Sequence, residues 1–236
     1  MRPQDASGLP GDGPEGVGTS PAHARDGDRA TVTVVGGGLA GCEAALQLAT
    51  RGHRVRLVEM RPVRSTPAHQ TDGLGELVCT NSFKSEDPGN AHGELKREMR
   101  ALGSVLLRSA DRSRVAAGSA LAVDRHLFSR AMTEAVEAEP AIEVVRQECE
   151  RLPDGPAVVA TGPLTSDALS GSIADALGDD GLAFFDAIAP IVHRESLDES
   201  VVFAAGRFGE DADYLNCPMD RGQYEAFIAA LEEADV

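Results

Sequence analysis

A glycine-rich turn carries the clearest chemical signal in the chain. Gly36, Gly38 and Gly41 have the spacing GxGxxG and stand between an apolar β-branched run, 30–35, and a helical pattern, 42–50. In such a turn the first glycine permits a tight bend, the second lets the backbone approach a pyrophosphate, and the third allows close helix–strand packing. Free N–H groups at the helix start would face the phosphates. The pattern predicts a dinucleotide site formed by Gly36, Gly37, Gly38, Leu39, Ala40 and Gly41.

Two further segments indicate which dinucleotide fits. Glu59 ends a second strand-like run, 54–59, where a carboxylate suits an adenosine ribose with both hydroxyls free, as in FAD or NAD rather than NADP. Thr161 and Gly162 follow a third run, 157–161, and a strand ending in Ala-Thr-Gly commonly passes near FAD in flavoproteins with two dinucleotide-binding domains. This second segment favours FAD as the cofactor. A glycine turn that binds nothing is the alternative.

The cysteines indicate nucleophilic chemistry rather than metal binding. Cys42, Cys79, Cys149 and Cys217 are widely spaced with no CxxC, which argues against zinc or a disulfide framework and fits a reducing cytosol. Cys79 and Cys217 stand in polar, loop-like segments, where an accessible thiolate could act. Cys42 has the position of a small core residue within the first helix. No histidine or carboxylate spacing suggests a metal ligand set.

The elements that must position these residues alternate between strands and helices. This alternation predicts an α/β fold with a Rossmann-like sheet. Asp124 is placed to cap the N-terminus of the predicted helix 124–138. Residues 1–28 are rich in Gly, Pro and Asp, and we expect them to be a disordered tail. The predicted strands are 30–35, 54–59, 142–145 and 157–161, and the predicted helices are 42–50, 94–107, 124–138, 166–177 and 222–233.

Composition narrows the classes of partner. Hydrophobic residues make up 42% of the chain, enough for a core, whereas aromatic residues are 4% and Trp is absent, so an aromatic platform for bases is not expected. No apolar run approaches the roughly 18 residues of a membrane helix, and no cationic leader opens the chain, so we expect a cytoplasmic protein. The formal net charge is −16. Residues 51–130 nevertheless carry 14 Lys and Arg against 9 Asp and Glu, so this segment is the only part expected to attract a polyanion. A solvated acidic surface is the alternative explanation of the charge.

The sequence closely resembles the bacterial folate- and FAD-dependent tRNA (uracil-5-)-methyltransferases. The matching motifs run colinearly from about residue 31 to about residue 230. The motifs that carry the resemblance are Gly36–Gly41, Glu59-Met-Arg-Pro62, Thr66-Pro-Ala-His69, Glu76-Leu-Val-Cys79 with Asn81-Ser82, Leu95-Lys96 with Glu98-Met-Arg100, Ala120-Leu-Ala-Val-Asp-Arg125, Ala160-Thr-Gly-Pro-Leu-Thr165 and Leu215-Asn-Cys-Pro-Met219. EMRP, ALAVDR and LNCPM are far more specific than the glycine turn.

The resemblance implies a reaction and roles for residues. Members of the family methylate C5 of the T-loop uridine in tRNA, with methylenetetrahydrofolate as carbon donor, reduced FAD as electron source and NAD(P)H to replenish it. By analogy Cys217 is the nucleophile and Cys79 its partner, and the order of the two roles stays open. Candidate contacts to tRNA phosphates, for which a solvated helix face is the alternative, are Arg61, Arg64, Lys84, Lys96, Arg97 and Arg100.

The resemblance covers only the N-terminal half of these longer enzymes. We therefore expect the N-terminal part of a glutathione-reductase-type FAD-binding domain over 29–190 and the start of an inserted domain over 191–236, with the C-terminal half missing. We therefore expect a gene fragment or one half of a split protein. Two alternatives stay open: a truncated, non-catalytic dinucleotide-binding module, and another FAD-dependent tRNA-modifying enzyme or NAD(P)H oxidoreductase.

Overall fold

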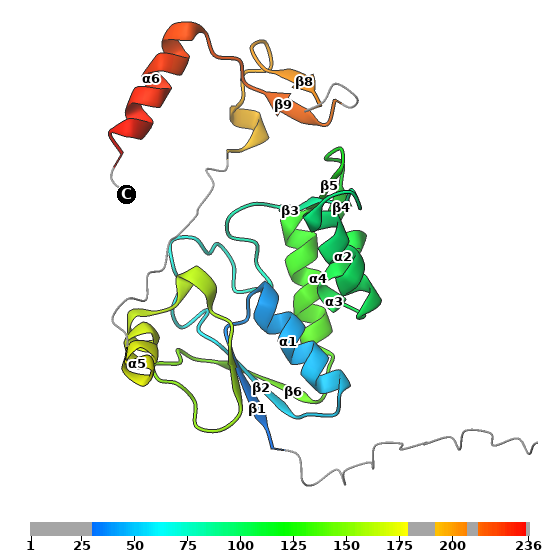
Figure 1. Ribbon diagram of the computed structural model, residues 1–236, viewed down its shortest axis with the longest axis vertical. Helices are drawn as coiled ribbons and strands as arrows, with labels where there is room; N and C mark the ends of the chain where they lie inside the picture. The colour runs from blue at the N-terminus through cyan, green and yellow to red at the C-terminus, as the bar shows by residue number, and fades with distance from the viewer. Residues whose placement is uncertain (1–29, 179–191, 207–211, 235–236) are drawn as a thin grey trace, which may run out of the picture.

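A four-stranded parallel sheet forms the base of the structure, a computed structural model that describes residues 30–178, 192–206 and 212–234 (Figure 1). The predicted disordered tail, 1–28, lies outside the described residues. Every neighbouring pair of strands is parallel, in the order β6-β2-β1-β7, which confirms the predicted Rossmann-like α/β fold. The strands are β1 (Val32–Val35), β2 (Val55–Glu59), β6 (Ile142–Arg146) and β7 (Ala157–Val159).

The first helix connects β1 to β2 and fills the centre of the core. Helix α1 (Leu39–Thr50) packs against both strands through an apolar face that includes Cys42, Ala45 and Leu46. These side chains meet Leu57 of β2, which is completely buried. Burying a leucine side chain contributes about 1.5–3 kcal/mol, so this face holds the helix on the sheet.

The predicted helix 94–107 is wrong, because two helices occupy this region. Helix α2 (Ala91–Ala101) ends before Gly103, which has a φ of 78°, and α3 (Val105–Arg112) begins after Ser104. The Ser104 side chain accepts a hydrogen bond from the Leu107 N–H, an N-cap that starts a new helix. A glycine in the left-handed region followed by a serine cap therefore interrupts the apolar periodicity.

A small antiparallel sheet, which the sequence patterns did not predict, lies beside these helices. It has the order β3-β5-β4, with β3 (Ser82–Ser85), β4 (Arg114–Val115) and β5 (Ala120–Val123). Helix α4 (Arg125–Glu137) follows β5, and the Asp124 carboxylate accepts hydrogen bonds from its first N–H groups, which confirms the predicted cap. Figure 1 shows α1 beside the helices α3 and α4, and both contact it.

The described C-terminal part consists of short elements. These are the 3-10 turn η1 (Gly162–Leu164), α5 (Asp167–Leu177), the 3-10 turn η2 (Arg194–Ser196), β8 (Phe203–Ala205), β9 (Tyr214–Asn216) and α6 (Arg221–Glu232). Strands β8 and β9 form an antiparallel hairpin, from which the Tyr214 hydroxyl donates to the Ala117 carbonyl at 2.7 Å. The predicted helices 166–177 and 222–233 are confirmed to within one residue.

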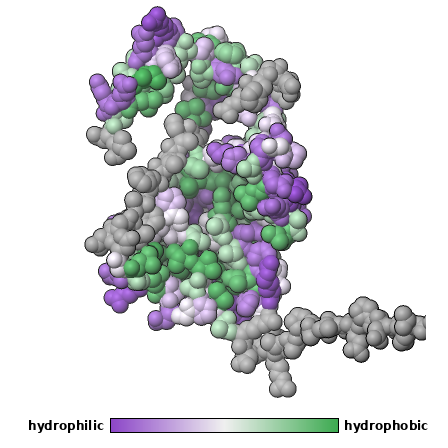
Figure 2. Space-filling view, viewed as in Figure 1, coloured by the Kyte–Doolittle hydropathy of each residue, from purple (hydrophilic) through white to green (hydrophobic). Residues whose placement is uncertain are grey.

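Apolar and hydrophilic side chains gather at opposite edges of one face of the molecule. Figure 2 shows apolar side chains gathered around α5 at the lower left and hydrophilic side chains along α2 and α3 at the right. Leu177 on α5 is 67% exposed. Within 30–178, 192–206 and 212–234, no helix combines the length and apolar character needed to span a membrane.

Candidate functional site

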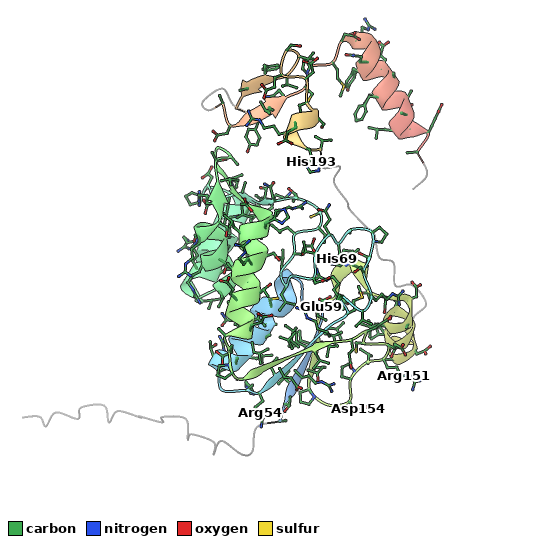
Figure 3. All side chains as sticks on the ribbon, turned by 180° about the vertical axis from the view of Figure 1, so that it is seen from behind. Arg54, Glu59, His69, Arg151, Asp154 and His193 are labelled. Carbon is green, nitrogen blue, oxygen red and sulfur yellow. The ribbon has the colours of Figure 1, made fainter. Side chains whose placement is uncertain are left out.

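The parallel strands point their carboxyl ends at a cavity of about 260 Å³. Val35 of β1, Glu59 of β2 and Ala160 after β7 all line it. Strand β1 connects onward to β2 on one side and pairs with β7 on the other, so the cavity lies where the strand order reverses, the usual ligand position in such sheets. In Figure 3, Glu59 and His69 lie toward this end, whereas Arg54 and Asp154 lie at the opposite end of the strands.

The three glycines of the GxGxxG spacing differ in the space around them. Gly36 has a φ of 98°, and a Cβ added there would stand 2.8 Å from the Ala160 carbonyl oxygen. A Cβ on Gly41 would stand 1.8 Å from the Gly36 carbonyl oxygen. By contrast, a Cβ on Gly38 would meet nothing within 4 Å, and Gly38 lines the cavity as the N-cap residue of α1. The turn therefore exposes backbone to the cavity at Gly38.

Most of the predicted cofactor contacts line this cavity. Two exceptions serve the turn itself. The Gly37 N–H donates to Glu59 Oε2 at 2.7 Å, and Gly41 packs against Gly36. The predicted residues that do line the cavity are Gly36, Gly38, Leu39, Ala40, Glu59, Thr161 and Gly162.

Glu59 is a buried carboxylate held from two sides. Besides the Gly37 contact, its Oε1 accepts from the backbone N–H and the Nε of Arg61, at 3.0 and 2.9 Å. Burial alone would raise the pKa of Glu59, but the Arg61 hydrogen bonds and charge, together with the Gly37 N–H, outweigh it and lower the pKa. Glu59 therefore presents an ionised acceptor to the cavity.

This lowered pKa predicts a contribution to acid stability. Glu59 binds its proton less tightly in the folded chain than at its ordinary pKa of 4.5, so its stabilisation is present above about pH 4.5 and is lost as the pH falls through the folded-state pKa. We expect the free energy of unfolding of the wild type to fall more steeply below about pH 4.5 than that of Glu59→Gln. Urea unfolding between pH 7 and pH 3 measures both slopes, and parallel curves would contradict the assignment.

Two of the six predicted phosphate contacts are not available to an RNA. Arg61 is 1% exposed and is paired with Glu59 and Glu76. Lys96 is buried, and its Nζ donates to the carbonyls of Phe83 and His92 at 2.8 and 2.9 Å. Burial lowers the pKa of Lys96. The structure thus corrects the prediction for Arg61 and Lys96, since both satisfy internal acceptors.

The other four predicted phosphate contacts are exposed at the surface. Arg64 pairs with Glu148, Arg97 with Glu94, and Arg100 with Glu86 and Asp111. Lys84 has a φ of 67° at an irregularity in β3, and no ion pair within the described residues engages its ammonium group. Such a bulge re-aims a side chain out of the regular strand pattern.

The two predicted catalytic cysteines lie in different places. Cys79 is exposed and lines the cavity. Cys217 is also exposed, but it follows the β8–β9 hairpin and is not among the residues that line the cavity. Cys42 is buried, and burial raises the pKa of its thiol to about 12, in keeping with a core role. Cys149 lines the cavity, and burial raises the pKa of its thiol.

Some cavity residues were missed by the sequence analysis. His69 lines the cavity, and its Nδ1 lies 2.9 Å from the Thr66 hydroxyl. Gln147, Glu148 and Cys149 follow β6, which pairs in parallel with β2, so the rule that ligands bind at the carboxyl ends of strands could have indicated them. Within 30–178, 192–206 and 212–234 no cluster of three or more potential metal ligands occurs.

The chain matches the sequence model of a known protein family. The sequence model of one protein family, described as "Glucose inhibited division protein A", matches residues 31–236. The chain belongs to this family. The matched residues include every described helix and strand of the chain, from β1 to α6.

The curated relatives described here carry a more specific name than the family model does. A protein of Rhizorhabdus wittichii named methylenetetrahydrofolate–tRNA-(uracil-5-)-methyltransferase TrmFO is 59% identical over 86% of this chain and 46% of its own length. The proteins of the same name from Rubrobacter xylanophilus and Syntrophomonas wolfei are 58% and 54% identical over 87% of this chain. These relatives confirm the predicted family resemblance. The chain spans about half the length of the curated relatives it matches, 46% and 48% in these two cases.

Solved structures are more distant. A Pseudomonas aeruginosa PqsL variant is 18% identical, with a TM-score of 0.39, over 66% of this chain and 47% of its own. A likeness at this level carries no conclusion about fold or function.

Proposed function

We propose that this family member binds FAD in the cavity at the glycine turn. The observation that carries the proposal is the combination of open space at Gly38, an ionised Glu59 and the start of α1 around one cavity. The backbone at Gly38 and the positive end of α1 would hold the pyrophosphate. The Glu59 carboxylate would accept ribose hydroxyls, and Thr161 and Gly162 would contact the flavin portion. The backbone N–H groups and the carboxylate suit the charge of a pyrophosphate and the hydroxyls of a ribose.

The activity that this site supports best is folate-dependent methylation of C5 of the T-loop uridine in tRNA. When bound, FAD supplies reducing equivalents for the one-carbon unit delivered by methylenetetrahydrofolate, with NAD(P)H as the source of electrons. Uracil C5 becomes nucleophilic once a thiolate adds at C6, and we assign this addition to Cys217. C5 then attacks the one-carbon unit, and a second group must take the C5 proton as the folate is expelled; Cys79 in the cavity lining is the candidate for this base. Hydride addition to the resulting methylene completes the methyl group and expels the Cys217 thiolate from C6.

The remaining assignments follow from this activity. Residues 29–190 would form the N-terminal part of the FAD-binding domain and residues 191–236 the start of an inserted domain. tRNA, the folate and NAD(P)H would be the partners, in the cytoplasm. The relatives' names, which include methylenetetrahydrofolate and tRNA, support this view.

The four exposed cations, Arg64, Lys84, Arg97 and Arg100, are the proposed tRNA contacts. We predict that Lys84→Gln weakens tRNA binding about equally for all sequences and makes the salt slope, d log K/d log [salt], less negative by about 1, because one phosphate contact is lost. Filter binding across a salt series measures this slope. Arg221→Gln, which removes an exposed cation far along the chain, serves as the control. An unchanged slope in the Lys84 variant would remove this residue from the interface.

The activity is tested by product analysis. The purified chain is incubated with unmodified tRNA transcript, FAD, NADPH and methylenetetrahydrofolate labelled in the methylene carbon. The proposal predicts label in ribothymidine at the T-loop position. FAD binding without labelled ribothymidine would favour a non-catalytic dinucleotide-binding module instead.

A further inference from the structure

One buried guanidinium joins the glycine turn to the segment that carries Cys79. Arg61 Nε lies 2.9 Å from Glu59 Oε1, and Arg61 Nη1 lies 2.7 Å from Glu76 Oε2. The side chains of Arg61, Glu59 and Glu76 are 1%, 6% and 10% exposed. A cation between two carboxylates at this depth is largely shielded from solvent counterions, so each carboxylate depends on Arg61 for its positively charged partner.

Glu76 organises the segment at the other end of this bridge. Its Oε1 accepts from the Gln70 N–H at 2.9 Å, and its Oε2 accepts from the Thr71 N–H and hydroxyl at 3.3 and 3.1 Å. Glu76 stands three residues before Cys79, and 76–79 lines the cavity without a break. The carboxylate therefore fixes where this stretch of the cavity wall begins.

A third tie holds the same assembly from the sheet. Arg146, the last residue of β6, donates from Nη1 to the Arg61 carbonyl at 3.1 Å and to the Asp72 carbonyl at 2.9 Å. Arg61 Nη1 also donates to the Thr71 carbonyl at 3.2 Å. The connection from Glu59 to Glu76 thus runs through fixed groups and not through a mobile surface pair.

We propose that Arg61 is a positioning residue that couples nucleotide binding at Glu59 to the placement of Cys79. This inference rests on the proposed function, since it needs an adenosine ribose at Glu59. A ribose hydroxyl that donates to Glu59 shares the oxygen lone pairs that Arg61 now uses. The Arg61 guanidinium then bonds less strongly to Glu59 and more strongly to Glu76, and residues 76–79 of the cavity wall move with Glu76.

Two substitutions alter the Glu59–Arg61–Glu76 bridge in different ways. Glu76→Gln leaves the Glu59–Arg61 contact in place, but either orientation of the new amide turns an NH2 toward an N–H donor, from Arg61, Gln70 or Thr71. Arg61→Lys keeps one positive charge, but a single ammonium cannot present the fork that contacts both carboxylates. Glu94→Gln, in an exposed ion pair on α2, is the matched control.

The test measures the alkylation rate of Cys79 by iodoacetamide, followed by peptide mass spectrometry on the full chain, with and without saturating ADP. In the wild type and in Glu94→Gln, ADP should change the rate about fivefold, the lower end of ordinary couplings between sites. In Glu76→Gln and Arg61→Lys this ADP effect should disappear, while calorimetry shows that Glu76→Gln still binds ADP with an affinity near that of the wild type.

The outcomes separate this inference from the proposed function. If the wild type fails to bind ADP, the nucleotide site itself is wrong and both fall. If ADP binds but leaves the alkylation rate of Cys79 unchanged in the wild type, the coupling is overturned. It is also overturned if ADP changes the rate equally in the wild type, Glu76→Gln and Arg61→Lys, because ADP then merely covers the thiol. Far-ultraviolet circular dichroism identifies a variant that does not fold, in which case the other of the two variants decides.

Discussion

Cys217→Ala should abolish ribothymidine formation, with a rate loss of about 10⁴-fold or more, the scale on which covalent catalysts depend on their nucleophile. Without a thiolate to add at C6, the C5 carbon of uracil stays too weakly nucleophilic to attack the one-carbon unit. The Cys217 side chain is exposed and lies outside the cavity lining. Its removal should therefore leave FAD absorbance and FAD affinity unchanged.

A neighbouring substitution controls for damage to the segment. Met219→Leu keeps the side-chain volume at a position that is 53% exposed, and it should retain both activity and FAD. Cys79→Ala should also lose activity, since Cys79 is the proposed partner. Methylation by Cys217→Ala at the wild-type rate would remove this residue from the mechanism and leave Cys79 as the candidate nucleophile.

Two alanine substitutions in the glycine turn should have opposite profiles. In Gly38→Ala the new Cβ meets no protein atom within 4 Å, and the backbone there has a φ of −76°, so the free energy of unfolding should change by less than about 1 kcal/mol. The methyl group occupies the space proposed for the pyrophosphate. Overpacking of about 1–3 kcal/mol corresponds to FAD affinity about 5- to 150-fold weaker.

In Gly41→Ala the damage is to the fold instead. Its Cβ would lie 1.8 Å from the Gly36 carbonyl oxygen, so the turn and α1 must move apart. We expect a loss of about 1–3 kcal/mol or more in the free energy of unfolding, together with loss of FAD. Thermal unfolding and flavin fluorescence measure both quantities. Equal FAD affinity in Gly38→Ala and the wild type would mean that no phosphate approaches this turn.

The sequence predicts the first strand–turn–helix–strand unit well because two independent signals agree there. β-branched runs mark β1 and β2, and the glycine spacing marks the turn between them. The antiparallel sheet escaped prediction because β3 is the short, mostly polar run Ser82-Phe-Lys-Ser85, and it contains an irregularity at Lys84. The apolar periodicity across α2 and α3 concealed the break at Gly103 and Ser104.

The site was predicted in part, for similar physical reasons. Glu59 and Thr161 line the cavity as expected, because the carboxyl end of a parallel strand fixes where its following residue lies. Arg61 was expected at the surface, because charged residues are seldom buried without a partner. Its partner Glu76 is supplied by a loop, and no local pattern indicates such a pairing. The separation of Cys217 from the cavity likewise depends on tertiary structure.

Direct titration of the purified chain with FAD tests the central claim, that the turn at Gly36–Gly41 presents its backbone to a dinucleotide. Flavin fluorescence and isothermal calorimetry are recorded together as FAD is added. We expect saturable binding to a single site, with competition by ADP. A flavin signal that stays unchanged over the whole titration, with no heat of binding, would contradict it.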